Sequence, residues 1–178
     1  MDDHCRFHRI FVLFFNFTFS ILRMLNVVLI EPEIPNNTGN IGRLCVGTGS
    51  RLHLVKPYGF KITDTAVKRA GLDYWPNLDL HEYDSVPEWM EQITDLSRVF
   101  LFSARSERSF LAVDFKDGDW LVFGKESVGL SKEVQELFAN HLSIPTTGLI
   151  RSHNLANAVT FALGESLRQI NGVGLVGD

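Results

Sequence analysis

The sequence lacks the features by which several classes of protein are recognised. Only two of its 178 residues are cysteines, Cys5 and Cys45, which excludes a small scaffold held together by disulfides. It has no CxxC or HExxH pair, so no common zinc motif is present. It also has no internal repeat and no continuous apolar run of the ~18 or more residues that a membrane helix needs. We therefore expect a soluble, cytoplasmic protein with neither a metal nor a membrane partner.

An excess of positive charge is also missing. The chain holds 17 Lys and Arg against 21 Asp and Glu, so it cannot bind nucleic acid simply by being basic overall. The charge is nevertheless uneven, because residues 34–72 contain six basic residues and one acid, whereas residues 73–97 contain seven acids and no Lys or Arg. This pattern predicts either a solvated surface or a local polyanion-binding face, with Arg51 and Lys56 as the candidate RNA contacts.

The first 23 residues differ from the rest. Residues 10–22 carry no charge and hold five phenylalanines, and Arg6 and Arg9 precede them, as in a short signal peptide. No small-residue cleavage site follows, however, and a typical buried strand begins after Met24. Two interpretations remain open: an additional half-buried strand within residues 15–21, or an upstream extension of a chain whose natural start is Met24. We divide the chain into this extension, 1–23, and one domain, 24–178.

Short apolar runs alternate with helical patterns along that domain. The expected strands are Asn26–Ile30, Leu52–Val55, Val99–Phe102, Trp120–Phe123 and Leu142–Ile144. The expected helices are Asn40–Thr48, Ser85–Thr94, Ser131–Ala139 and a long helix from Leu155 to Ile170 that Gly172 ends. Alternation of this kind predicts an α/β fold with a mostly parallel sheet flanked by helices. The long helix has a stripe of small apolar residues, which fits burial against the sheet or close packing against a second copy of the chain.

Parallel sheets bind ligands beyond the carboxyl ends of their strands, so the loops there are the candidate sites. In the first, residues 31–43, two prolines stiffen the backbone, Asn37 and Thr38 can cap a helix, and Gly39 permits a left-handed turn. Arg43 then adds a cation about one turn into the helix. This arrangement suits a phosphate or a developing oxyanion, and equally a capped helix with a surface arginine.

Two further loops have similar properties. In residues 123–130, Gly124 and Gly129 allow close approach of the backbone to a ligand on either side of Glu126, without the spacing of a nucleotide-binding Walker motif. In residues 144–154, Ser152 and Asn154 are typical residues for the start of a helix. No paired carboxylates and no Ser/His/Asp set can be read from the sequence.

Together, the three loops resemble the motifs of the SPOUT superfamily of RNA methyltransferases. The matching patterns are Asn37-x-Gly39-Asn40-x-x-Arg43, Gly124-x-Glu126-x-x-Gly129-Leu130 and Ser152-x-Asn154 followed by a small-residue helix. The runs LNVVLIEPEIPNNTGNIGRLC and RAGLDYW are similar to the TrmL branch, whose members methylate the ribose 2′-hydroxyl of the tRNA wobble nucleotide. The resemblance covers Met24 to about Gln169.

The resemblance implies a fold and a cofactor that composition does not reveal. It implies a SPOUT fold, in which the carboxyl-terminal segment forms a deep trefoil knot, and an obligate homodimer whose active site takes loops from both subunits. The cofactor would be S-adenosyl-L-methionine. The residues that the resemblance assigns to it are Phe102, Ser103, Gly124, Glu126, Gly129, Ile144, Thr146 and Ser152.

The resemblance also implies roles in the reaction. Arg43 would activate the ribose hydroxyl, and because a guanidinium is a poor base we expect it to act as an electrostatic clamp. Asn37 and Asn154 would shape the loops and hydrogen-bond the ribose of a tRNA anticodon stem-loop. Two residues depart from the family pattern: His153 replaces an apolar residue, and Gly164 stands where a tyrosine is common. The same chemistry on ribosomal RNA or at another tRNA position, or a non-catalytic RNA-binding or assembly role, are the alternatives.

Overall fold

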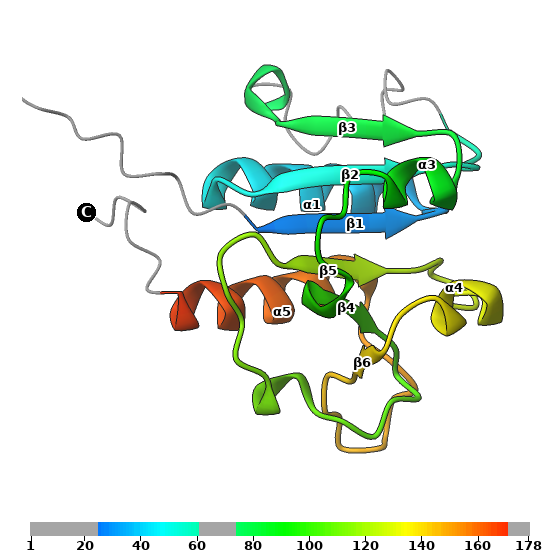
Figure 1. Ribbon diagram of the computed structural model, residues 1–178, viewed down its shortest axis with the longest axis vertical. Helices are drawn as coiled ribbons and strands as arrows, with labels where there is room; N and C mark the ends of the chain where they lie inside the picture. Colours follow the sequence, from blue (N-terminus) through cyan, green and yellow to red (C-terminus); the bar gives the residue numbers. More distant parts are fainter. Residues whose placement is uncertain (1–24, 61–73, 171–178) are drawn as a thin grey trace, which may run out of the picture.

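The structure, a computed structural model, describes residues 25–60 and 74–170. Several predicted features lie outside the described residues. They are the amino-terminal extension, residues 69–73 of the RAGLDYW run, three of the six basic residues of segment 34–72, and Gly172. Six strands form one sheet in the order β3-β2-β1-β5-β4-β6, and every neighbouring pair is parallel (Figure 1). The strands are β1 (Asn26–Ile30), β2 (Arg51–Val55), β3 (Leu80–Tyr83), β4 (Val99–Phe102), β5 (Trp120–Phe123) and β6 (Asn140–Leu142). This confirms the predicted α/β class.

Helices cover both faces of the sheet (Figure 1). The longer helices α1 (Pro35–Thr48) and α5 (Leu155–Gln169) lie on one face, and the short helices α3 (Val86–Met90) and α4 (Lys132–Glu136) lie on the other. Single 3₁₀ turns occur at Trp75–Asn77, Leu96–Arg98 and Phe110–Ala112. Alternate strand residues enter two separate apolar clusters: Val27 and Leu29 pack with α1 and α5, whereas Val28 and Ile30 pack with α3 and α4.

Strand prediction succeeded where burial is complete. β1, β4 and β5 have the expected bounds, since all or nearly all of their residues are buried, and β2 begins one residue early. The prediction for Leu142–Ile144 was wrong, because β6 ends at Leu142. The next residue, Ser143, instead pairs with the loop before β5, donating from its backbone N–H to the carbonyl of Arg108 at 2.8 Å.

Helix boundaries differ from the sequence prediction at the start of α1. The helix begins at Pro35, five residues before the expected start, since proline is well suited to the first helical position. Asn37 and Thr38 therefore lie within the first turn and do not cap it, and Gly39 is helical and makes no left-handed turn. The left-handed residue is Gly49, with φ 64°, which ends the helix.

The remaining helices are close to expectation. α3 and α4 are shorter than the predicted segments, and α5 ends at Gln169. The predicted capping residue Ser85 accepts a hydrogen bond from the backbone N–H of Glu88, at 3.4 Å. The carboxylate of Glu88 accepts from the backbone N–H of Asp84 at 2.7 Å. In the parts of the chain that the structure describes, no helix is long and apolar enough to cross a bilayer.

Candidate functional site

The sheet has one topological switch point, between β1 and β5. From β1 the chain builds outward to β2 and β3, and the later strands β5, β4 and β6 lie on the other side of β1. In parallel sheets the crevice beyond the carboxyl ends at such a point is where ligands bind. A cavity of about 610 Å³ occupies this place, within the range that small-molecule sites have. The loops after β1, β4, β5 and β6 all line it, so the three loops singled out from the sequence meet in one place.

A hydrogen-bonded chain of side chains joins these loops. The carboxylate of Glu126, in the loop after β5, accepts from the backbone N–H groups of Glu33 and Ile34 at 2.8 and 3.2 Å. It also accepts from the side-chain amide of Asn37 at 3.0 Å. The oxygen of Asn37 in turn accepts from the side-chain amide of Asn154 at 3.1 Å. Asn154 caps α5, as predicted, through its own oxygen. One buried amide, Asn37, thus connects all three loops.

The loops after β1 and β5 are also fastened to each other directly. The carboxylate of Glu33 accepts from the backbone N–H and the hydroxyl of Ser127, both at 2.9 Å, and these hydrogen bonds lower the pKa of Glu33. The ammonium of Lys125 lies 2.5 Å from the carboxylate of Glu31, which raises the pKa of Lys125. Glu31 is the one non-glycine residue with positive φ, 52°, in the described ranges. Sequence reasoning missed Glu33 and Ser127, although the two carboxylates of the Glu-Pro-Glu run were a signal.

The two glycines of the second loop allow the loop to fold closely on itself. A Cβ atom on Gly124 would lie 2.3 Å from the backbone of Gly129 and Leu130, so this position admits no side chain. Gly129 has φ 79°, in the left-handed region that glycine favours, and its N–H donates to the carbonyl of Lys125 at 2.9 Å. Gly124 also lines the cavity, so its expected close approach to a ligand stays a prediction, and the structure adds a close approach to its own chain.

The cavity wall combines aromatic surface with one unpaired polar atom. The rings of Phe102 and Phe123 stack with centroids 4.7 Å apart, and both residues line the cavity. The half-buried ring of His153 also lines it, 5.2 Å from the ring of Phe161. The Nε2 atom of His153 is buried without a hydrogen-bond partner among the described residues. Such an atom needs an explanation, and a ligand or a water molecule supplies one.

The structure brings most of the predicted site residues together. Those that line the cavity are Asn37, Phe102, Ser103, Gly124, Glu126, Gly129, Ile144, Ser152 and Asn154. Two do not line it. Thr146 is exposed in the loop before α5, where its hydroxyl accepts from the N–H of Gly148 at 3.2 Å. Arg43 is exposed on α1, with its guanidinium carbon 5.3 Å from the centre of the Tyr74 ring.

The predicted RNA contacts Arg51 and Lys56 lie at opposite ends of β2. Arg51 pairs with Asp79 at 3.0 Å, and Lys56 pairs with Asp84 at 2.8 Å. Both acids belong to the acidic segment, which reaches them because β3 is the neighbour of β2. The interpretation of separate basic and acidic faces is therefore wrong for these residues, since the two segments neutralise each other side by side.

By its fold and its cavity, the protein is of the doubly wound parallel α/β class, with a candidate ligand site at the switch point of the sheet. Residues 24–164 match the family described as "SpoU rRNA Methylase family". The chain belongs to this family.

Two of its relatives are similar over almost their whole length. A tRNA (cytidine(34)-2'-O)-methyltransferase of Aeromonas hydrophila is 45% identical over 153 residues, which are 85% of this chain and 97% of the relative. A solved structure described as "Structural insights into the 2-OH methylation of C/U34 on tRNA" is 47% identical, with a TM-score of 0.81, and the match covers 85% of this chain and 99% of that one. The SpoU methyltransferase AviRb of Streptomyces viridochromogenes, in complex with the cofactor AdoMet, is 26% identical, with a TM-score of 0.72, covering 83% of this chain and 60% of that one.

Proposed function

We propose that this protein transfers a methyl group from S-adenosyl-L-methionine to the ribose 2′-hydroxyl of tRNA nucleotide 34, the wobble position. The observation that carries the proposal is the connection of the three loops through Glu126, Asn37 and Asn154 around one cavity at the β1/β5 switch point. The similarity to methyltransferases that act on this nucleotide supports the choice of substrate.

The residues of the cavity fit the cofactor. The stacked Phe102 and Phe123 offer an apolar wall to an adenine ring, and the unpartnered Nε2 of His153 offers a polar contact. Ser103, Gly129 and Ile144 line the same cavity and belong to the loops that would hold the rest of the cofactor. When bound, S-adenosyl-L-methionine supplies an electrophilic methyl group on a sulfonium sulfur. We assign the cofactor contacts to the cavity-lining residues predicted from the sequence, with Thr146 at the exposed margin.

The chain's own residues must orient the hydroxyl and stabilise the charge that develops on it. Asn37 and Asn154 hold each other in position at the cavity, where their amides can direct the ribose. Arg43 would stabilise the developing alkoxide as a fixed cation, because a guanidinium does not release its proton near neutral pH. Its position outside the cavity of its own chain supports an active site completed by a second protomer.

The outward face of α5 supports this homodimer. Phe161 is 51% exposed and Leu111 is 61% exposed, and with Phe110 they line a mainly apolar hollow of about 620 Å³. Gly164 lies in the same hollow, where a Cβ atom would meet nothing within 4 Å. Large exposed apolar side chains around a hollow are typical of a surface that a partner covers.

We include the trefoil knot in the proposal. β6 lies at the edge of the sheet beyond β4, whereas α5, which follows it, packs against α1 and β5 nearer the middle. The segment from β6 to α5 must therefore return across the sheet's carboxyl end, as the carboxyl-terminal segment of a SPOUT fold does when it passes through its own chain. The proposal leaves out Arg51 and Lys56, the RNA contacts expected from the sequence, because each is already paired with a carboxylate.

Methyl transfer by the purified protein tests the function. Undermethylated tRNA is incubated with the protein and S-adenosyl-L-methionine labelled in the methyl group, and the labelled nucleotide is mapped. We expect label on the 2′-oxygen of nucleotide 34. Label elsewhere in tRNA, or on ribosomal RNA alone, would reject the wobble position while retaining the chemistry. Binding of both cofactor and tRNA without any transfer would identify a non-catalytic RNA-binding protein.

A further inference from the structure

Apart from Arg43, the Lys and Arg side chains of the described residues divide into two groups. In the first, each cation pairs with a carboxylate within 4.0 Å; this group comprises Arg51, Lys56, Arg98, Lys125, Lys132 and Arg168. In the second, Arg105, Arg108, Lys116 and Arg151 form no ion pair with a carboxylate of residues 25–60 or 74–170. All four are exposed.

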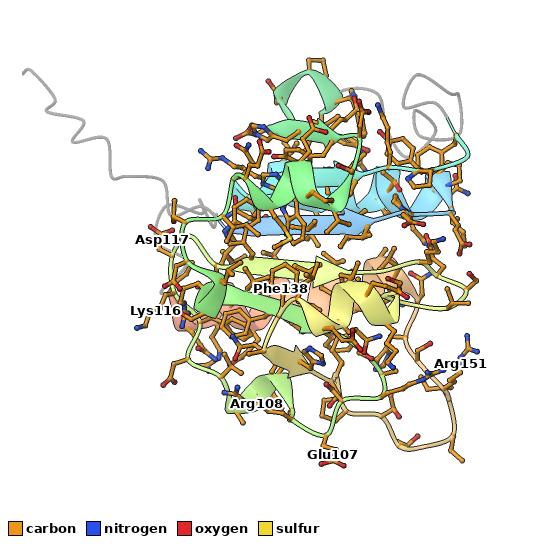
Figure 2. All side chains as sticks on the ribbon, turned by 45° about the vertical axis from the view of Figure 1, so that its right-hand side comes forward. Glu107, Arg108, Lys116, Asp117, Phe138 and Arg151 are labelled. Atoms are coloured by element: carbon orange, nitrogen blue, oxygen red, sulfur yellow. The ribbon has the colours of Figure 1, made fainter. Side chains whose placement is uncertain are left out.

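The three arginines of the second group lie on two adjacent loops at the cavity. Arg105 follows β4 and Arg151 precedes α5, and both line the cavity. Arg108 lies three residues beyond Arg105, and its carbonyl accepts from the backbone N–H and the hydroxyl of Ser143, at 2.8 and 3.3 Å. That contact ties the two loops together. In Figure 2, Arg108 and Glu107 are labelled at the bottom of the molecule, Arg151 at the right, and Lys116 at the left edge on the segment before β5. Of the three arginines, Arg108 does not itself line the cavity.

The composition of these loops suits a polyanion. Residues 103–109, Ser-Ala-Arg-Ser-Glu-Arg-Ser, hold two arginines and three serines against the single acid Glu107. Arginine forks and serine hydroxyls are the donors that most often contact phosphate oxygens. An arginine already paired with a carboxylate must lose that contact before it binds a phosphate. Among the described residues, Arg105 and Arg108 have no such contact to lose, and Arg151 would give up only a 3.4 Å hydrogen bond to the carbonyl of Ser127.

We propose that Arg105, Arg108 and Arg151 form the phosphate-contacting rim of the cavity, across which the RNA strand lies when one of its nucleotides enters. The proposal rests on the proposed function and deepens it, because it moves the main RNA contacts from the edge at β2 to the β4–β5 and β6–α5 loops. Because the protein has a net charge of −4, binding depends on this local surface.

Salt dependence of tRNA binding tests the rim. Dissociation constants of the full-length protein for an unmodified tRNA transcript are measured by fluorescence anisotropy over a series of KCl concentrations. Each lost phosphate contact lowers the slope of log K against log salt by ~0.7–0.9. The Arg105→Gln/Arg108→Gln double variant is therefore expected to lower it by ~1.4–1.8 and to weaken binding about tenfold or more, and Arg151→Gln to lower it by ~0.7–0.9.

Two matched variants remove the same charge elsewhere. Arg51→Gln/Lys56→Gln removes two cations that are already paired, and Lys116→Gln removes one unpaired cation away from the cavity. Both are expected to leave the slope close to that of the wild type. The melting temperature of each variant is measured alongside, and exposed positions are expected to leave it unchanged.

The outcomes separate this proposal from the function on which it rests. If the wild type methylates nucleotide 34 but the Arg105/Arg108 variant binds tRNA with an unaltered slope, the rim is wrong and the function stands. The same conclusion follows if the Arg51/Lys56 variant loses as much slope as the rim variant. If the wild type transfers no methyl group while the rim variants lose their salt dependence, the function is wrong and the RNA-binding rim stands.

Discussion

The side-chain amide of Asn154 donates a 3.1 Å hydrogen bond to the side-chain oxygen of Asn37, 117 residues earlier in the chain. The same Asn37 donates to Glu126 at 3.0 Å, so a single amide holds the loops after β1 and β5 to the start of α5. Asn154 has a second task, since its oxygen accepts from the backbone N–H of Ala156 at 3.0 Å and caps the helix. The hydrogen bond to Asn37, here called the bridge, and the cap of α5 can be tested separately with a substitution that keeps the cap and removes the bridge.

Asn154→Ser keeps a helix-capping oxygen but is too short to reach Asn37, whereas Asn154→Ala loses both contacts. We expect Asn154→Ser to lower the free energy of unfolding by about 1 kcal/mol and Asn154→Ala to lower it by about 2 kcal/mol. Urea denaturation measures both values. In a double-mutant cycle with Asn37→Ala, the coupling energy is expected to be about 0.5–1.5 kcal/mol. A coupling of zero would show that the bridge contributes nothing to stability.

Gly124→Ala is expected to lower the free energy of unfolding by about 1–3 kcal/mol, because the new Cβ atom would lie 2.3 Å from the backbone of Gly129 and force the loop apart. Gly47→Ala is the matched control, since Gly47 lies in α1 with nothing within 4 Å of its Cβ position. The control is expected to raise the free energy of unfolding by about 0.5–1 kcal/mol. Equal effects of the two substitutions would contradict the close approach at Gly124.

Arg43→Ala is expected to lower kcat about 100-fold or more while changing the KM for tRNA only a few-fold, because a clamp on the developing alkoxide acts in the transition state. Arg43→Lys keeps the charge without the planar fork and is expected to restore part of kcat. Steady-state kinetics with saturating cofactor measures both constants. A loss confined to KM would make Arg43 a binding residue.

Phe161→Asp tests the proposed dimer. A carboxylate in the apolar hollow on α5 would lose its water against the partner, and Arg168 in the same hollow is already paired with Glu165. The variant is therefore expected to be a monomer by size-exclusion chromatography with light scattering. Methyl transfer is expected to disappear with the dimer if Arg43 serves the partner's site. Leu96→Asp is the control, because Leu96 is 49% exposed, close to the 51% of Phe161, but does not line the hollow. A dimeric Phe161→Asp protein would place the interface elsewhere.

We expect acid stability to depend on His53, a buried residue of β2 that is 3% exposed. Burial, and then the neighbouring His81 and Arg51, lower the pKa of His53 from 6.5 to about 3. The native ring therefore stays neutral while the unfolded chain takes up a proton, so stability is complete above pH 6.5 and falls as the pH drops toward 3. We expect a loss of at most about 1.4 kcal/mol per pH unit in this window.

Urea denaturation between pH 7 and pH 5 measures this effect. His53→Gln retains hydrogen-bonding atoms toward Tyr83 and Asn26, which the imidazole contacts at 2.9 and 3.2 Å, but cannot be protonated. Its stability is expected to vary less with pH across the window. Carboxylates whose pKa is lowered, such as Glu165 at about 2, lose their contribution only below about pH 4.5. An unchanged pH dependence in His53→Gln would assign the acid sensitivity to other groups.

The predictable part of the fold is the part buried on both sides. β1 could be predicted to the residue because its last four residues are apolar and polar residues bound the run, which is typical of a strand buried on both faces. β3 escaped prediction because Leu80, His81 and Glu82 are partly or fully exposed at the edge of the sheet. It is held in place by its partner β2 and by ion pairs such as Arg51–Asp79, and a residue pattern read along one strand does not contain them.

The candidate site was also predictable only in part. Motif residues such as Glu126 and Asn154 could be identified from their order in the chain, but their contacts could not, because each joins residues about 90 or more positions apart. Ser127 was missed since serine is a common loop residue and its partner Glu33 lies 94 positions away. Arg43 lies apart from the cavity, more than two turns into α1, because the helix begins at Pro35. The sequence pattern placed the start of the helix five residues later, so this separation could not be predicted.

The fastening between the loops after β1 and β5 has an evolutionary consequence. Each loop supplies a carboxylate that the other must satisfy: Glu31 and Glu33 face Lys125 and Ser127, and Glu126 faces the backbone beside them. If one loop is exchanged alone for a loop that lacks these partners, a negative charge is left unpaired. We therefore expect the two stretches to be inherited as one unit, and a chimera that transplants both together to be more stable than one that transplants either alone.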